Sequence, residues 1–195
     1  MKKLLILALL ASAITPALAA PPPTPKVVVL DRVGILQFSK VGRSVAQQLQ
    51  ALNTQTKASF DSQQKSLVAE GQALRQQVAI MAADQRQKKE DAFNAKVRAI
   101  EETAQRRAAQ IQQAGQVAQA AVAQALGPIV EDLVKERGAN MVLDKQAVVF
   151  SNSNAFDITT DAISRLDAKM SNYKVVLGAP MPTAAPAAGA AAPKQ

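Results

Sequence analysis

The sequence predicts a mainly α-helical protein with a small β body, in which a long antiparallel helical hairpin is inserted between strands of a small oligomeric β-barrel. Residues 41–126 contain no proline and only three glycines, and they are rich in Ala, Gln, Lys, Arg and Glu. This composition favours long helices. Short runs of apolar, mostly β-branched residues lie before and after this stretch, and such runs favour strands. We therefore expect a hairpin arm that projects from a body built by both ends of the chain.

Residues 1–19 have the pattern of a secretory signal peptide. Lys2 and Lys3 precede an apolar run at Leu4–Ile14, and a small-x-small cleavage signal ends at Ala19. A membrane anchor is the alternative, but the apolar run is too short to cross a bilayer. The absence of cysteine excludes both a lipid-attachment Cys and a disulfide framework. We expect an exported, periplasmic protein with no second hydrophobic stretch of membrane-spanning length.

The first part of the body is expected at residues 26–40, after a proline-rich spacer at residues 20–25. Val27–Leu30 is an unbroken apolar run, which predicts a strand that is buried on both faces. Arg32–Val41 is expected to form a connector, and some of its apolar side chains are expected to pack on the body. Either Ser39 or Gly42 marks the start of the long helix.

Within residues 41–126 the apolar residues recur in alternating steps of three and four, which is the spacing of a coiled-coil seam. The seam consists of two series, Phe60, Leu67, Gly71, Leu74, Val78, Met81 and then Phe93, Val97, Ile100, Ala104, Ala108, Ile111, Gly115, Ala118, Val122. The two series meet near Asp84, which is expected to cap a second helix, with Gln87 reaching back as in a capping box. Each helix would hold about 40 residues and extend about 60 Å. One continuous helix is the alternative to this hairpin.

The seam is weak for a coiled coil because many of its residues are small or polar. A buried Leu or Phe contributes about 1.5–3 kcal/mol, and few such residues occupy the seam. The step through Leu52, Thr56 and Phe60 is four plus four, a discontinuity that locally unwinds a supercoil. We expect an arm that bends and is stiffest near the body. A rigid spacer is the alternative.

The arm carries an excess of basic residues. Its outer part has ten Lys and Arg against seven Asp and Glu, and removal of the signal peptide would lower the formal charge of the chain from +8 to +6. This balance suggests acidic partners or anionic surfaces, and in a periplasm we expect no nucleic acid partner. The residues expected to contact an unfolded or anionic partner are Arg86, Lys88, Lys89, Arg106 and Arg107. The alternative is a solvated helix face with intrahelical pairs such as Glu102 with Arg106.

Residues 127–177 are expected to complete the body. Pro128 should break the second long helix and start a new helix over Ile129–Arg137, which Gly138 ends. The low-complexity Pro/Ala tail at residues 178–195 is expected to be disordered.

Between Gly138 and the Pro/Ala tail, the sequence changes to short apolar runs. Asn140–Asp144 and Ala147–Phe150 predict a strand–turn–strand hairpin. Asp157 is expected to cap a last helix over Ile158–Met170, which has one apolar face. Val175–Leu177 is a further candidate for a short strand.

The body predicted in this way is small, at roughly 70 residues, for an independent core. Its short apolar strands would also leave unpaired edges that favour association. We therefore expect several copies of the chain to close a shared barrel. The residues expected at that interface are Val27, Val29, Val142, Val148 and Phe150.

The composition argues against an enzyme. The chain has no His, Cys or Trp, which removes the usual proton shuttle, the thiol nucleophile and the commonest transition-metal ligands. Asp31, Asp144 and Asp157 are the candidate carboxylates of the body, and their positions are those of strand-end and capping residues. We expect no catalytic, cofactor-binding or metal-binding site.

Taken together, these motifs resemble the Skp/OmpH family of periplasmic chaperones over roughly residues 26–172. The resemblance rests on Asp31-Arg32-Val33-Gly34-Ile35-Leu36, Ser39, Gly42, the Gln/Lys/Ala-rich hairpin, Pro128-Ile129, Gly138, Val142 to Phe150 and Asp157-Ile158-Thr159-Thr160. The Pro/Ala tail after Gly178 departs from the family pattern.

The resemblance implies a homotrimer in which strands of three chains form a central barrel and three hairpins enclose a cavity. It also implies that the cavity holds unfolded outer-membrane proteins, without nucleotide, and keeps them from aggregating before insertion. Two other functions remain open, namely a structural coiled-coil adaptor of the cell envelope and a protein that binds lipopolysaccharide or anionic membranes through the basic residues of the arm.

Overall fold

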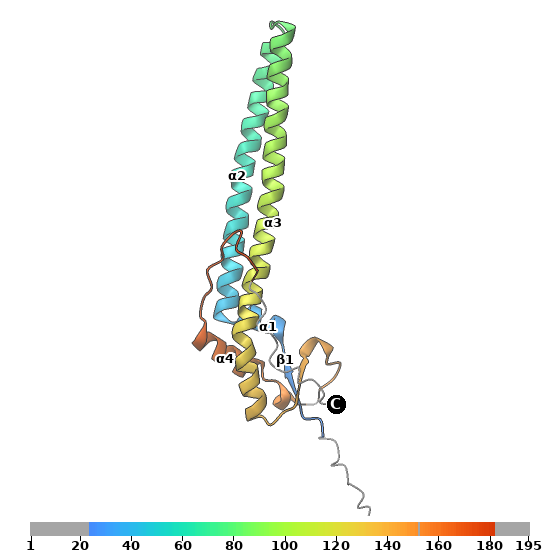
Figure 1. Ribbon diagram of the computed structural model, residues 1–195, viewed down its shortest axis with the longest axis vertical. Coiled ribbons are helices and arrows are strands. Elements are labelled where there is room, and N and C mark those ends of the chain that lie inside the picture. The colour runs from blue at the N-terminus through green and yellow to red at the C-terminus, as the bar shows by residue number, and fades with distance from the viewer. Residues whose placement is uncertain (1–23, 152, 182–195) are drawn as a thin grey trace, which may run out of the picture.

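The computed structural model describes residues 24–151 and 153–181, and it consists of a small α/β body from which a helical hairpin projects (Figure 1). The expected signal peptide, nearly all of the proline-rich spacer and most of the Pro/Ala tail lie outside the described residues. The elements in chain order are β1 (Val27–Leu30), α1 (Arg32–Phe38), α2 (Lys40–Val78), α3 (Ala83–Glu136), β2 (Met141–Asp144), the 3-10 helices η1 (Lys145–Ala147) and η2 (Asn154–Phe156), and α4 (Thr159–Lys169).

The body is organised around a two-stranded sheet. β1 and β2 pair in parallel, with Val28 beside Val142 and Val29 beside Leu143. The chain reaches β2 only after the whole arm, and such a long crossover is what a parallel pair requires. Next to the sheet, the backbone N–H of Ile158 donates to the carbonyl of Val29 at 2.9 Å. The core is formed by β1, α1, the start of α2, the end of α3 and α4.

The connector expected after β1 is a helix, since residues 32–38 form α1, and its Ile35 packs in the core as expected. The Asp31 carboxylate accepts a hydrogen bond from the Gly34 N–H at 2.7 Å, so this residue caps α1. Ser39, which is fully buried, then caps α2 by accepting from the Gly42 N–H at 3.1 Å. The expectation that Ser39 or Gly42 marks the start of the long helix is confirmed.

The hairpin is confirmed and the single continuous helix is wrong. α2 and α3 lie side by side along the arm and are joined by the four residues between Val78 and Ala83 (Figure 1). The expected capping box is also wrong. The N-cap of α3 is Ala82, without a side-chain hydrogen bond, and the Gln87 amide donates forward to the Asp91 carboxylate at 2.9 Å. Asp84 lies instead in the first turn of α3, where a carboxylate complements the helix dipole.

The helix break expected at Pro128 is wrong, because α3 continues through it to Glu136. A proline within a helix removes one hydrogen bond and crowds the preceding turn. Leu126, Ile129 and Leu133 on either side of it are buried in the core, and this packing offsets the local loss. Gly138 follows with a φ of +59°, so its expected role at the helix end is confirmed.

The strand–turn–strand hairpin is likewise wrong. β2 pairs with β1, the residues that follow it form η1, and Val148–Phe150 belongs to no strand. The Asp144 carboxylate accepts from the Gln146 N–H at 3.0 Å, and this local turn redirects the chain immediately after β2. Within the described residues, the apolar run at Ala147–Phe150 therefore does not pair with a strand.

The last helix, α4, is confirmed, although its N-cap residue is Ile158. Asp157 nevertheless satisfies one free donor of the first turn, since its carboxylate accepts from the Thr159 N–H at 2.9 Å. Ile158, Ala162 and Leu166 are fully buried, as the single apolar face predicts. The short strand expected at residues 175–177 is wrong, because this segment is irregular.

One helix among the described residues, α3, contains an 18-residue window with a mean hydropathy of 1.2, which by length and composition could cross a membrane. The expectation that no second stretch of this kind exists is therefore wrong. One third of that window is buried within the structure (33%), and core helices of soluble proteins meet the same criterion. The window alone is weak evidence for a membrane span.

Candidate functional site

An uncovered apolar surface lies on the side of the sheet that faces away from the helices of the core. It surrounds a shallow hollow of about 550 Å³. We call this surface the apolar face and define it by Val27, Val29, Leu143, Val148, Phe150 and Phe156. Phe150 is 83% exposed and Phe156 is 49% exposed, so a single chain leaves two aromatic rings in contact with solvent. Contiguous apolar surface of this kind marks an interaction site.

Four of the five residues predicted for an oligomer interface meet on the apolar face, namely Val27, Val29, Val148 and Phe150. Val142 does not line it. The sheet register places Val142 beside Val28, whose side chain is in the core, and side chains alternate between the two faces of a strand. Sequence reasoning missed Leu143 and Phe156. Leu143 could have been found from a parallel register with Val29, but no local signal indicates Phe156.

Two ion pairs fix the chain at the border of the apolar face. The Lys145 ammonium lies 2.9 Å from the Asp157 carboxylate, and the Arg32 guanidinium lies 2.5 Å from the Asp144 carboxylate. Burial opposes the charged form of Asp157, but hydrogen bonds from Lys145 and Thr159 outweigh it and lower the pKa of this carboxyl. The hydrogen bond from the Gln146 backbone N–H, followed by that from Arg32, lowers the pKa of Asp144.

A lowered pKa in the folded state means that Asp157 stabilises the body at neutral pH. The contribution is complete above the ordinary pKa of about 4 and is lost as the pH falls through the lower pKa of the folded state. We expect Asp157→Asn to reduce the free energy of unfolding at pH 7 by up to about 1 kcal/mol, after allowance for solvent screening. Urea unfolding at pH 7 and pH 2.5 measures this, with Asp61→Asn on the arm as the control. A difference of the same size at both pH values would contradict the assignment.

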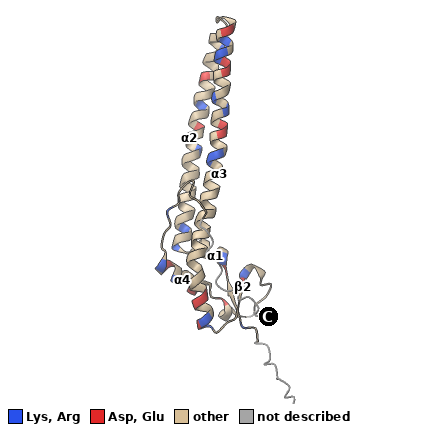
Figure 2. Cartoon of the chain, viewed as in Figure 1, with Lys and Arg blue, Asp and Glu red and all other residues tan. Residues whose placement is uncertain are grey.

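Charged residues cover the outer part of the arm, whereas its lower part is almost free of them (Figure 2). The basic residues singled out from the sequence form two groups and not one. Lys88 and Lys89 are exposed near the turn, where the Arg86 guanidinium donates to the carbonyl of Met81 at 3.4 Å. Arg106 and Arg107 lie about 27 Å further down α3, at 1.5 Å per residue. The structure therefore offers two separate basic regions.

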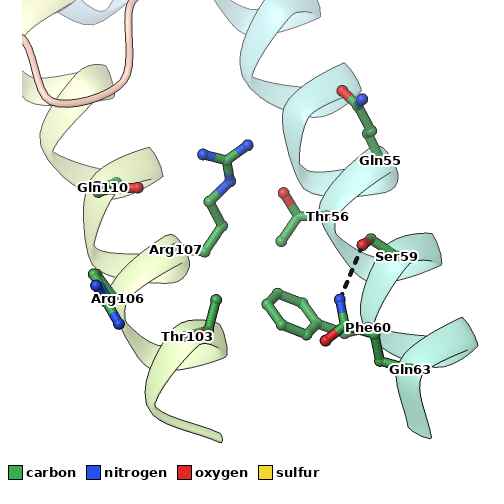
Figure 3. Close-up of a pocket in the computed structure, with 9 residues that line it drawn as sticks. All are labelled: Gln55, Thr56, Ser59, Phe60, Gln63, Thr103, Arg106, Arg107 and Gln110. Atoms are coloured by element: carbon green, nitrogen blue, oxygen red, sulfur yellow. Dashed lines mark hydrogen bonds between the residues drawn. The ribbon is translucent and has the colours of Figure 1, made fainter. Parts of the chain in front are cut away.

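A hollow of about 450 Å³, lined mostly by residues with polar side chains, lies between the two helices at the level of the second basic group (Figure 3). We call it the mid-arm hollow. It is lined by Gln55, Thr56, Ser59, Phe60, Gln63, Thr103, Arg106, Arg107 and Gln110. The Gln63 amide donates to the Ser59 hydroxyl at 3.3 Å on one wall. No carboxylate lines the hollow, and within the described chain neither arginine forms an ion pair.

The mid-arm hollow coincides with the discontinuity predicted in the seam. The expected seam residue Ala108 is exposed, and Arg107 is the half-buried residue at this level of α3. A guanidinium therefore stands on the inner side of α3 at this level, where a small apolar group was expected. The seam resumes above the hollow, where Gly71 faces Phe93. A Cβ on Gly71 would lie 3.3 Å from the ring, so glycine allows this close approach.

The described residues hold no group of three or more His, Cys, Asp or Glu side chains placed to bind a metal ion. The features that the structure does offer are surfaces. The apolar face can associate with another apolar surface, and the arm offers charged and apolar groups over a great length. Ile80 at the tip is 90% exposed and Val68 on α2 is 55% exposed, so apolar groups stand among the charges.

Comparison with known proteins gives a match to one family model. The model described as "Outer membrane protein (OmpH-like)" matches residues 26–166. A crystal structure of an OmpH-like protein from Caulobacter crescentus, described as an outer membrane chaperone, has a TM-score of 0.71 at 24% sequence identity. The similarity covers 80% of this chain and 92% of that chain. No match was found among curated proteins.

Proposed function

This chain belongs to the OmpH-like family, and we propose that it is an ATP-independent holdase chaperone of the periplasm, which binds unfolded outer-membrane proteins between helical arms and prevents their aggregation before membrane insertion. The observation that carries the proposal is the combination of a long, interrupted helical arm with an apolar face that one chain leaves uncovered. The apolar face is a platform for assembly, and the arm is an extended surface for weak contacts.

Assembly follows from the apolar face. A sheet of two short strands is at the lower limit of stability in water, and an added copy of the chain would pair its edges and cover Phe150 and Phe156. A homotrimer is the arrangement that the family implies. Three arms raised from one platform would enclose a space in which a chain is held by many small contacts. No cofactor or nucleotide is needed, because release of the client requires only that each contact is weak.

The proposal is tested by light scattering. An unfolded outer-membrane protein diluted from denaturant should aggregate alone and remain in solution when this protein is present at one assembled oligomer per client. A soluble protein of similar size and charge serves as the control. Aggregation that proceeds equally in both samples would reject the holdase.

The basic tip of the arm is expected to speed capture of acidic clients. Lys88 and Lys89 are exposed and lie in the first turns of α3, and neither forms an ion pair among the described residues. Electrostatic steering of this kind raises association rates and is weakened by salt. We expect Lys88→Glu with Lys89→Glu to slow client capture about tenfold at low ionic strength, as measured by stopped-flow fluorescence. The charge-preserving pair Lys88→Arg and Lys89→Arg should bind at the original rate. Equal rates in both pairs of variants would remove the electrostatic role.

A second candidate is binding to lipopolysaccharide or another anionic membrane surface. The observation that favours it is the mid-arm hollow, where Arg106 and Arg107 stand among neutral polar groups without a carboxylate. Sedimentation with anionic and neutral vesicles distinguishes this function, since equal binding to both would exclude it. A structural adaptor is less well supported, because a spacer gains from a stiff apolar seam and this seam is interrupted.

A further inference from the structure

The segment that follows α4 runs back along the base of the arm (Figure 1). α4 ends at Lys169, and the family match ends at residue 166, so this segment lies beyond the part of the chain that the family model covers. It is irregular in structure, yet it leaves the body and crosses from α2 to α3 (Figure 1). We call residues 170–181 the strap.

The side chain of Gln48 on α2 binds the strap through both ends of its amide. Its nitrogen donates to the carbonyl of Tyr173 at 2.7 Å, and its oxygen accepts from the Val175 N–H at 3.0 Å. The two backbone groups are two residues apart, which is the pattern by which one strand pairs with another. The amide nitrogen also lies 3.1 Å from the Ser44 hydroxyl, one turn away, which fixes its orientation.

Apolar and polar contacts extend this attachment to both helices. Met170, Tyr173 and Val175 are partly buried and pack against the core cluster. Further along, the Gln113 amide of α3 donates to the carbonyl of Ala179 at 3.3 Å. Because Gln48 is on α2 and Gln113 is on α3, the strap connects the two helices at the base of the arm.

The contact between the strap and Gln113 lies where the buried interior of the arm ends. On α3 the buried residue farthest from the body is Ile111, and from residue 46 to residue 110 no described side chain is buried. Gln113 lies one helical turn below Gln110, which lines the mid-arm hollow. The lower arm is therefore both packed and connected, and the polar interruption begins directly above it.

We propose that the strap locks the lower arm to the body, so that bending of the arm begins at the mid-arm hollow and not at the body. This role depends on contacts within one chain and is independent of chaperone activity. It assigns a mechanical function to the stretch of sequence that follows the family-matched region.

Hydrogen exchange on two truncated chains tests the strap. One chain ends after Lys169 and lacks the strap, and the matched control ends after Met181 and keeps it. We expect backbone amides near Gln48 and Gln113 to exchange at least about tenfold faster in the shorter chain, since several hydrogen bonds and apolar contacts are lost. Amides of the outer arm should exchange equally in both. Equal exchange at the arm base, or an increase spread over the whole molecule, would overturn the proposal.

A point substitution gives a second, milder test. Gln48→Ala removes both amide hydrogen bonds to the strap while the strap itself remains. It should accelerate exchange at the arm base about 5–30-fold, the factor that corresponds to one or two weak hydrogen bonds. Gln47→Ala, at the exposed neighbouring residue, is the control and should leave exchange unchanged. Identical exchange in the two variants would show that the strap does not hold α2.

Discussion

Gly42→Ala is expected to destabilise the protein severely, by about 3 kcal/mol or more. An added Cβ would lie 1.9 Å from the carbonyl oxygen of Leu36 and 2.6 Å from its carbonyl carbon. Both atoms belong to the backbone of α1, so no side chain can rotate away to make room. The corner between α1 and α2 would have to open, which would also break the bond from Gly42 to the buried Ser39. Because domains are stable by only about 5–15 kcal/mol, part of the population should unfold at moderate temperature.

Urea unfolding followed by circular dichroism measures this effect, and Gly127→Ala is the matched control. Gly127 lies inside α3, and nothing stands within 4 Å of an added Cβ there. Alanine is the better helix former by about 1 kcal/mol, so the control should be neutral or stabilised. If Gly42→Ala unfolds at the same urea concentration as the unmodified protein, the close packing of α1 against α2 is wrong.

Phe150→Asp is expected to abolish assembly of the chain while leaving each copy folded. The Phe150 ring is mostly exposed in the single chain and belongs to no strand or helix, so the monomer does not depend on it. In an oligomer that covers the apolar face, the substitution would bury an unpaired carboxylate at every copy. An uncompensated buried charge costs several kcal/mol, which exceeds what a small interface can lose. Val29→Asp should have the same effect, although it also acts on β1.

Sedimentation velocity gives the mass of each variant, and circular dichroism shows whether it is folded. Val68→Asp is the control, since Val68 is an exposed valine on the arm and lies outside the apolar face. A folded oligomer of unchanged mass in Phe150→Asp would show that the apolar face is not the interface. A folded monomer of the unmodified protein would reject assembly altogether.

Local patterns in the sequence were sufficient to predict the arm. Steps of three and four placed Phe60, Leu67 and Val78 on the inner side of α2, and all three are among the half-buried residues of that helix. The absence of proline favoured two long helices over strands. The four-plus-four step at Phe60 also marked a real feature, since it lies at the mid-arm hollow. Periodicity and helix propensity depend on near neighbours in the chain, so they can be read without the fold.

The candidate site was predictable in its composition and not in its arrangement. Val27 and Val148 could be chosen because apolar β-branched runs must be covered somewhere. Their meeting with Phe156 depends on a parallel pairing across more than a hundred residues, and no local signal reports such a register. The assignment of Ala108 to the seam was wrong, because the partly buried residues of α3 continue in regular steps of four and three from Ala104 through Arg107 to Ile111.

By itself the sequence determined the long paired helices, the strand at Val27–Leu30 and the basic, weakly packed character of the arm, since these follow from spacing and composition. Only the tertiary structure decided that α3 passes through Pro128, that β2 joins β1, and that the strap binds Gln48. In each of these cases contacts between distant parts of the chain outweigh the local preference of a few residues, because a buried core stabilises more than one lost hydrogen bond or one strand pairing costs.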